Sequence, residues 1–440
     1  MTQEITHANL IKMRQALADM PQAQTLRNAV MNNGINAVAQ RPDAAVTLDP
    51  TYSIDLPTGD VSFQKKSGRC WLFATLNTLR HDFEQKYNVK NFELSQNYLS
   101  FWDRIEKANL FYEKILATAT KPITDREVAF ALAGPDFDGG QWDNAVALIQ
   151  KYGAVPKSVM PETYNSDLTT EFNSTLNLKL RTDAIKLRQL VADQAPSDKI
   201  SETRTAMLSE IYRLSVYAFG EPVETFDFVY RDNDQQYHLD QGLTPLSFYQ
   251  KYLNRNFDDY VTVVSSPQAS KQYNQLYSLD SQDTVVEGHP MRLLNLPPDR
   301  LKALAIQSLK AGEPIWFGND VLADLDRQKG WLDSNLYDYS SLFSIDLTMP
   351  KDQRLDYRQG VVSHAMTLTG VNLVDDQPTK WQVENTWSDK VGNKGYFSMS
   401  DAWFDDYVYE VVIKKEYLTK EEQALLDQTP IKLDPWDALQ

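Results

Sequence analysis

The chain has 440 residues, of which 42% are hydrophobic and 24% are charged, and its formal net charge is −16. This composition is that of an ordinary folded protein, and the length exceeds the roughly 300 residues at which a single hydrophobic core stops growing. The acidic balance argues against partners that are themselves negatively charged, namely nucleic acids and anionic membrane surfaces.

Cysteine usage and hydropathy narrow the class of protein further. Cys70 is the only cysteine, so an intrachain disulfide and a zinc cluster built on thiolates are both excluded. The first twenty residues contain no apolar stretch of signal-peptide length, and no window approaches the roughly 18 apolar residues of a membrane span. We therefore expect a cytoplasmic protein that needs no membrane, no metal and no other cofactor.

The first third of the chain is predicted to be mainly helical. Residues 9–40 carry apolar side chains at helical spacing, and residues 45–63 are expected to be extended because they contain proline and glycine. A helix is predicted to follow Cys70, since its leucines recur on one face. Another helix is expected over residues 94–115, opened by Ser95 as its N-cap.

The rest of the chain mixes helices with strands. A short helix in QWDNAVALIQKYG is expected to stop at Gly153, and residues 167–219 are expected to form two or three charged helices. A hairpin is predicted around TFDFVYRDNDQQYHL. Beyond it we predict a helix from Pro298 to about Lys310, strands at 314–321, 361–373 and 381–385, a helix in LTKEEQALLD and an extended tail.

Cys70 is a candidate nucleophile because it lies where a glycine-containing loop enters a helix. The partial positive charge of a helix N-terminus stabilises a thiolate, which predicts a lowered thiol pKa. A single cysteine on a helix is nevertheless more often a packed core residue, since free cysteine is among the most buried residue types.

A thiolate nucleophile needs an imidazole partner, and the chain has five histidines. His364 differs from the other four because it lies in the apolar, strand-forming run VVSHAMTLTGV, where a sheet would hold it rigidly. A histidine in such a run is still more often structural than catalytic when judged by residue type alone.

Two polar residues complete the candidate site. Asn385 closes the next strand-like run and would orient the imidazole of His364, while Gln64, six residues before Cys70, would offer an N–H to a developing oxyanion. Taken alone, an asparagine before a turn is usually turn chemistry, and a glutamine in a loop is usually solvated. The order Gln, Cys, His, Asn is what favours a catalytic interpretation.

These residues resemble a known family, the papain-like cysteine peptidases, and within it the bleomycin hydrolase and bacterial aminopeptidase C group. The similar strings cover most of the chain: QKKSGRCWLFATLN, ELSQNYLSFWDRIEKAN, GGQWDNAVALIQKYGAVPKSVMPET, WFGNDV and WFDDYVYEVVIKK. The resemblance implies an α+β fold with a helical lobe, an antiparallel β lobe and a mainly helical inserted hook region. It also implies a homohexamer that hydrolyses peptides.

Carried over to this sequence, the resemblance makes Cys70 the nucleophile, His364 the general base and acid, Asn385 the orienter and Gln64 the oxyanion donor. Gly139 and Gly140 resemble the glycine pair along which the substrate backbone runs, although without the family they read equally well as a plain turn. The family's C-terminal arm lies in its own cleft, which places Gln440 among the substrate-binding residues.

Five regions follow from this interpretation. They are an N-terminal helical segment that packs on the catalytic core (1–44), a lobe with the Cys70 helix (45–166), the helical hook (167–285), a β lobe with His364 and Asn385 (286–425) and the C-terminal arm (426–440).

Three differences from the family pattern leave alternatives open. Phe63 stands where asparagine is common, and Ser388 stands where glycine is common. The arm is also about three residues shorter after Trp436 than the usual WDPMGALA ending, which favours an oligopeptide endopeptidase as the alternative to an aminopeptidase.

Two further classes of function are less favoured. Nucleic-acid binding through the hook is disfavoured because residues 167–285 contain 11 Lys and Arg against 17 Asp and Glu, a net charge of −6. A non-catalytic scaffold is disfavoured because all four catalytic residue types are present.

Overall fold

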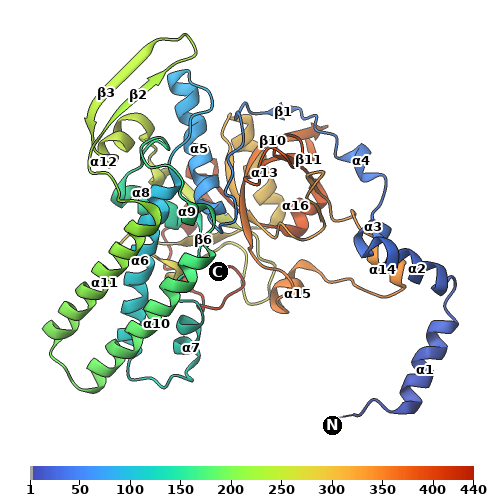
Figure 1. Cartoon of the computed structure of the whole chain (residues 1–440). Coiled ribbons are helices and arrows are strands. Elements are labelled where there is room, and N and C mark those ends of the chain that lie inside the picture. The colour runs from blue at the N-terminus through green and yellow to red at the C-terminus, as the bar shows by residue number, and fades with distance from the viewer. Residues whose placement is uncertain (1–2) are drawn as a thin grey trace.

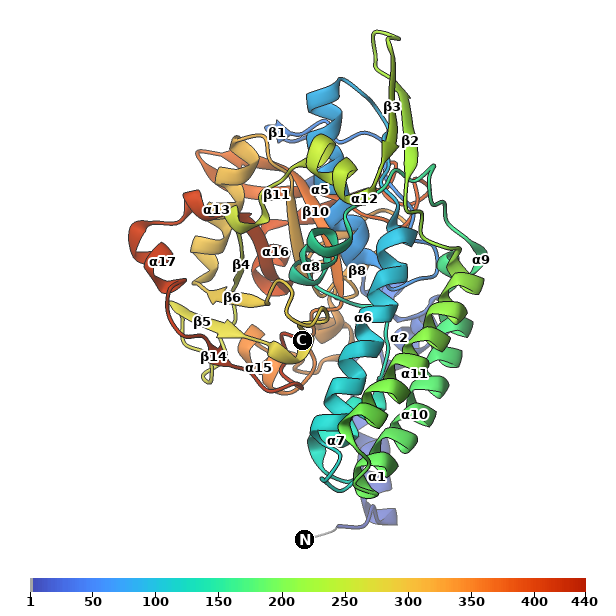
Figure 2. The same cartoon turned by 90° about the vertical axis from the view of Figure 1, so that its left-hand side faces the viewer.

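A helical lobe and a large sheet lie side by side in the computed structural model, which describes residues 3–440 (Figure 1). The helical lobe contains α5 (Cys70–Tyr87), α6 (Gln96–Ala117), α7 (Arg126–Ala133), α8 (Trp142–Tyr152), α9 (Tyr164–Asp167), α10 (Thr170–Ala192), α11 (Ser197–Phe219) and α12 (Pro245–Phe248). Helices α6, α10 and α11 run alongside one another in both views (Figures 1 and 2). The α+β prediction is therefore confirmed.

The sheet has the strand order β14-β5-β6-β4-β13-β7-β10-β11-β12-β9-β8, with β1 paired to the side of β10. Its strands are β1 (Ile54–Asp55), β4 (Tyr260–Val264), β5 (Gln275–Ser278), β6 (Arg292–Asn295), β7 (Ile315–Asn319), β8 (Leu325–Asp326), β9 (Trp331–Leu332), β10 (His364–Val374), β11 (Gln377–Glu384), β12 (Tyr396–Ser400), β13 (Val408–Lys414) and β14 (Ile431–Lys432). The central strands β7, β10 and β11 pair antiparallel, which places His364 opposite Asn319.

Shorter helices surround this sheet and begin the chain. They are α1 (His7–Ala18), α2 (Ala23–Asn33), α3 (Ile35–Ala39), α4 (Ala44–Thr47), α13 (Pro298–Lys310), α14 (Tyr339–Phe343), α15 (Lys351–Asp356), α16 (Asp401–Tyr407) and α17 (Lys420–Leu425). Among residues 3–440, no helix combines the length and apolar character needed to cross a membrane.

Local sequence signals explain several of these boundaries. The Oγ of Ser95 accepts the N–H of Tyr98 at 3.0 Å, so Ser95 caps α6 as predicted. Gly153 ends α8 at a φ of 77°, and a Cβ there would lie 2.3 Å from the backbone of Pro245, so only glycine fits.

One hydrophobic cluster extends across both lobes. Trp71 of α5 is buried in a cluster that also contains Trp316 of β7 and Ala365 of β10. The indole N–H of Trp316 donates to the carbonyl oxygen of Trp71 at 3.2 Å, so the sheet and the Cys70 helix are held together behind the site.

The N-terminal segment 1–44 was expected to pack on the catalytic core. Among its described residues, α1 and α2 contain no buried side chain, and they extend away from the body of the molecule (Figure 1). Ala39 and Ala44 are buried where the segment reaches α14 and the sheet.

The region 167–285, expected to be the hook, has its long helices only in its first half. Helices α10 and α11 are followed by the hairpin of β2 (Phe226–Arg231) and β3 (Tyr237–Leu243), as the sequence predicts. From Tyr260 the chain enters the large sheet as β4 and β5, because the β-branched run YVTVV is suited to a buried strand. The sheet thus begins before residue 286.

Candidate active site

Cys70 is the first residue of α5, and the sheet covers it. Its backbone N–H belongs to the first turn of a helix, where N–H groups have no partner within the helix. The backbone N–H groups of Ala365, Trp71 and Cys70 itself face the sulfur. Because Ala365 follows His364 on β10, the thiol lies beside the strand that carries the imidazole.

The loop before Cys70 is tied to the segment after β11. The backbone N–H of Gln64 donates to the carbonyl oxygen of Thr386 at 2.9 Å, and the side-chain oxygen of Gln64 accepts the hydroxyl of Thr386. One amide N–H of Gln64 donates to the carbonyl oxygen of Ser67 at 2.6 Å. Gln64 also lines the cavity that contains Cys70, so its second amide N–H is available at the site.

The contact between His364 and Asn385 determines which ring nitrogen is the base. The Oδ1 of Asn385 accepts the backbone N–H of Thr386 at 2.8 Å, which identifies this atom as the oxygen. It lies 3.0 Å from Nε2 of His364, so Nε2 donates a proton. In the neutral ring Nδ1 then carries no proton and is the nitrogen that can accept one. The ring of Trp387, 5.0 Å from the imidazole, covers this pair.

Burial determines the charge state of both groups. It raises the pKa of the Cys70 thiol to about 11 and lowers the pKa of His364 to about 4. The backbone N–H groups oppose the first shift and the bond to Asn385 opposes the second, but burial is the larger effect. The prediction of a lowered thiol pKa from the helix start alone is therefore corrected. A thiolate on Cys70 and an imidazolium on His364 can form together, when the thiol proton moves to the imidazole.

Asp138 is a residue that sequence reasoning did not single out. Its carboxylate accepts the backbone N–H of Gly68 at 2.8 Å and the amide of Asn173 at 2.8 Å, and it pairs with the buried guanidinium of Arg104. Its carbonyl oxygen accepts the indole N–H of Trp71 at 2.7 Å. One residue thus connects the loop before Cys70, helix α5 and helix α10.

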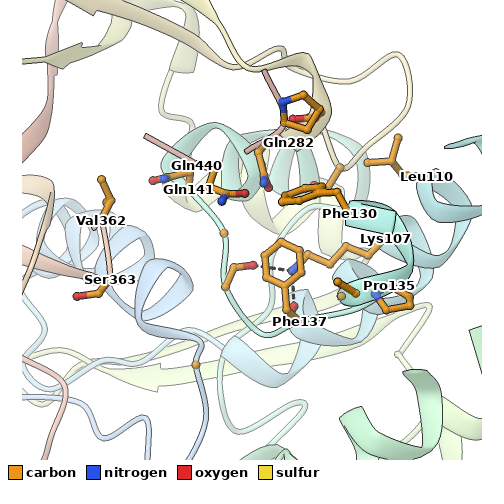
Figure 3. A pocket seen from close by; sticks show the side chains of 18 of the residues that line it. Lys107, Leu110, Phe130, Pro135, Phe137, Gln141, Gln282, Val362, Ser363 and Gln440 are labelled. Atoms are coloured by element: carbon orange, nitrogen blue, oxygen red, sulfur yellow. Dashed lines mark hydrogen bonds between the residues drawn. The ribbon is translucent and has the colours of Figure 1, made fainter. Parts of the chain in front are cut away.

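Lys107 supports the loop that carries the two glycines. Its ammonium donates to the carbonyl oxygen of Phe137 at 2.8 Å (Figure 3). It also donates to the carbonyl oxygen of Gly139 at 2.6 Å and to the carboxylate of Asp103 at 2.7 Å. A Cβ on Gly140 would lie 2.6 Å from the ring of Trp71. Glycine is required there by close approach to the indole, so the plain-turn interpretation is insufficient.

A cavity of about 950 Å³ lies between the lobes, and most of the predicted site residues line it. Its lining includes the predicted residues Gln64, Cys70, Gly139, Gly140, His364 and Gln440. Asn385 is fully buried behind Trp387 and does not reach the cavity surface. The described residues contain no group of three or more His, Cys, Asp or Glu side chains arranged to hold a metal ion.

The C-terminal segment forms part of the cavity wall. Strand β14 pairs in parallel with β5, and the chain then turns inward so that Pro435 and Gln440 line the cavity (Figures 2 and 3). The indole of Trp436 lies under the guanidinium of Arg126, 3.7 Å from the ring centroid, and is close to Phe130. The interpretation of the tail as a loose chain end does not fit these contacts.

The fold and this site together define a class of protein. A thiol at a helix start and an imidazole on a facing strand, oriented by an asparagine, form the arrangement of a papain-like cysteine peptidase. The chain belongs to the Peptidase C1-like family, whose family model matches residues 4–440.

Similar proteins cover the whole chain. Aminopeptidase G of Lactobacillus delbrueckii subsp. lactis is 46% identical over 439 residues, which is 100% of both chains. Aminopeptidase C of Streptococcus thermophilus is 46% identical over 94% of this chain and 93% of its own. The crystal structure of PepW from Lactobacillus rhamnosis is 53% identical, with a TM-score of 0.98 over 100% of this chain and 99% of the other.

Proposed function

We propose that this chain is a cysteine aminopeptidase that releases residues from the N-termini of peptides. The observation that carries the proposal is the C-terminal segment, because Pro435 and Gln440 share one cavity with Cys70 and His364. A cleft filled on one side by the chain's own arm leaves little room for a long substrate segment before the cleaved bond. The names of the relatives, Aminopeptidase G and Aminopeptidase C, support the same activity.

The proposed chemistry proceeds through an acyl-thioenzyme. Nδ1 of His364 takes the thiol proton as the sulfur of Cys70 attacks the carbonyl carbon, and the carbonyl electrons move to its oxygen. The amide of Gln64 and the backbone N–H of Cys70 donate to that oxyanion. The C–N bond then breaks, and His364 gives its proton to the leaving amine. Water, deprotonated by His364, hydrolyses the thioester and restores the thiol.

Asn385 has a supporting role in this scheme. By accepting the Nε2–H of His364 it keeps Nδ1 free of a proton and holds the ring in place. It does not touch the substrate, because it lies behind Trp387. We expect Asn385→Ala to lower kcat less than His364→Ala does, since orientation contributes less than proton transfer.

Two versions of one peptide test the exopeptidase proposal. A short peptide amide with a free α-amine and its N-acetylated form differ only in that terminus. We expect the free-amine form to be cleaved at its first bond and the acetylated form to be resistant, while Cys70→Ala cleaves neither. Efficient cleavage of the acetylated form would contradict the proposal and would favour the oligopeptide endopeptidase. The intact mass of the assayed protein should also be measured, because the test depends on the residue at which the arm ends.

We further propose that the chain assembles as a homohexamer. The support is the exposed apolar side of α1, where Met13 and Leu17 are one turn apart and more than half exposed, together with the exposed Met31 of α2. Short helices are marginally stable in water unless an apolar face is buried. We therefore propose that this face of α1 is covered by another copy of the chain. Light scattering should give six times the 50.4 kDa of one chain, and Met13→Glu with Leu17→Glu should reduce that mass. A wild-type monomer would refute the assembly.

The same reasoning extends to location and partners. We propose a cytoplasmic enzyme of peptide substrates without nucleic-acid affinity, supported by the single unpaired Cys70 and the net charge of −16. A salt-sensitive complex with DNA or RNA in a gel-shift assay at low ionic strength would contradict this.

A further inference from the structure

A buried ion pair holds the end of the C-terminal arm. The ammonium of Lys271 lies 2.8 Å from Oδ2 of Asp437, and the two side chains are only 3% and 14% exposed. Lys271 belongs to the connection between strands β4 and β5, whereas Asp437 lies three residues before the last residue of the sequence. The pair therefore joins the rigid sheet to the tip of the arm.

The same carboxylate shapes the tip itself. Its other oxygen, Oδ1, accepts the backbone N–H of Leu439 at 3.0 Å, and the carbonyl oxygen of Asp437 accepts the N–H of Gln440 at 3.2 Å. Leu439 is buried against Val264, Tyr277 and neighbouring apolar side chains. Asp437 thus fixes both where the tip is attached and the direction in which Gln440 enters the cavity.

Lys271 is itself held in position. Its ammonium donates to the side-chain oxygen of Gln268 at 2.8 Å, and the amide of Gln268 donates to Asp356 of α15 at 2.6 Å. By contrast, the ion pair at the base of the arm, between Lys432 and Asp280, is largely exposed and therefore weakly restraining. The buried pair is the stronger attachment, because removing one partner leaves an uncompensated charge in the interior.

We propose that Lys271 is a specificity-determining residue, which through Asp437 fixes the tip of the arm in the cavity and so limits which peptide termini can enter. This inference rests on the proposed aminopeptidase function. With Lys271 replaced by a neutral side chain, the carboxylate of Asp437 loses its counter-charge and turns toward water. The tip then leaves the cavity, and substrates with a longer or blocked N-terminal segment gain access to Cys70.

Lys271→Met tests the proposal, since methionine keeps the length of the apolar stem without the charge. Lys302→Met is the matched control: Lys302 pairs at 2.8 Å with Asp401 and is partly buried, but it is on α13 and does not contact the arm. The full-length proteins are compared on the free-amine and N-acetylated forms of one peptide. We expect the ratio of kcat/KM values, free-amine over acetylated, to fall at least tenfold in Lys271→Met and to change less than twofold in Lys302→Met.

Two further measurements separate specificity from misfolding. Carboxypeptidase digestion followed by mass spectrometry reports whether the tip is released, and it should trim Lys271→Met and Asp437→Asn faster than the wild type. The rate at which iodoacetamide alkylates Cys70 should not fall, because the catalytic pair is not touched and the cavity becomes more open. A tip that stays protected in Lys271→Met, or one that is released without a change in the substrate ratio, overturns the inference.

Failure of the proposed function gives a different result. A wild type that already cleaves the acetylated peptide as well as the free-amine form is not an aminopeptidase. A wild type that prefers the free amine, with a Lys271→Met variant that keeps this preference, leaves the function intact and refutes only the role of Lys271.

Discussion

Asp138→Asn should weaken both the fold and the catalytic loop, because its carboxylate serves four donors at once. These are the guanidinium of Arg104, the backbone N–H of Gly68, the hydroxyl of Thr169 and the amide of Asn173. An asparagine has only one acceptor oxygen. Whichever way its amide is turned, its NH₂ group faces donors, and at least one of them loses its partner.

The structure gives the magnitude of this loss. Removing one partner of a buried ion pair costs about 3–5 kcal/mol, but Arg104 keeps its second partner Asp136 at 2.8 Å, which favours the lower end of the range. An unpaired buried donor adds about 1–3 kcal/mol. We therefore expect the free energy of unfolding at pH 7 to fall by about 4 kcal/mol, measured by urea denaturation.

The pH dependence of the loss has a definite sign. Burial opposes ionisation of Asp138, but the charge of Arg104 and the hydrogen bonds from Gly68, Thr169 and Asn173 outweigh it and hold the pKa well below its usual range. A carboxyl whose pKa is depressed by folding stabilises the fold above its ordinary value of about 3.9 and loses that contribution as the pH falls below it. The difference between wild type and variant should thus be constant from pH 7 to about 5 and shrink below pH 4.

Asp136→Asn is the matched control for catalysis. It removes a charge from the same Arg104, but the side chain of Asp136 has no bond to the loop before Cys70. We expect both variants to be less stable, with kcat/KM falling at least tenfold more in Asp138→Asn. Equal activity of the two variants would refute the idea that Asp138 positions the loop.

Three further predictions follow from burial and close approach. In His364→Ala the thiol of Cys70 loses its proton acceptor, so no thiolate–imidazolium pair can form and iodoacetamide should alkylate it only at a more alkaline pH than in the wild type. Gly140→Ala should lower stability by about 1–3 kcal/mol, seen in urea denaturation, and raise KM, since its Cβ would lie 2.6 Å from the ring of Trp71. Burial, followed by the charge of Asp143, raises the pKa of Glu410 to about 8, so the stability that Glu410 contributes should decline from about pH 4.5 to 8; the decline seen in thermal unfolding should be smaller in Glu410→Gln than in the wild type.

The residues that react could be predicted from the sequence because their order and the strings around them resemble a known family, although each residue taken alone has a commoner structural interpretation. A cysteine at a helix start, a histidine in a strand-forming run and an asparagine at the next strand end each have a signal in adjacent residues. The start of α6 at Ser95 rests on a local capping pattern, whereas the α+β class was implied by the family resemblance. The structure places Cys70, His364 and Gln64 around one cavity, as that order of residues suggested.

The supporting residues could not be found this way, because their partners are distant in the sequence. Judged by residue type, Lys107 would be expected to face solvent, because lysine is rarely buried. None of its neighbours in the sequence indicates that its ammonium binds the carbonyl oxygen of Gly139. The pairing of Lys271 with Asp437 joins two segments that only the fold brings together. Burial also depends on segments that are distant in the sequence. The helix start alone predicts a lowered pKa for Cys70, but burial by the sheet raises it.

Helix α10 contributes directly to the structure around the catalytic loop. Thr169 and Asn173, at the start of α10, donate to Asp138, and Asp138 in turn holds Gly68 two residues before Cys70. A shift of α10 relative to the sheet would therefore break hydrogen bonds at the catalytic loop. It follows that the orientation of the Cys70 loop depends on donors that α10 and the residue before it supply.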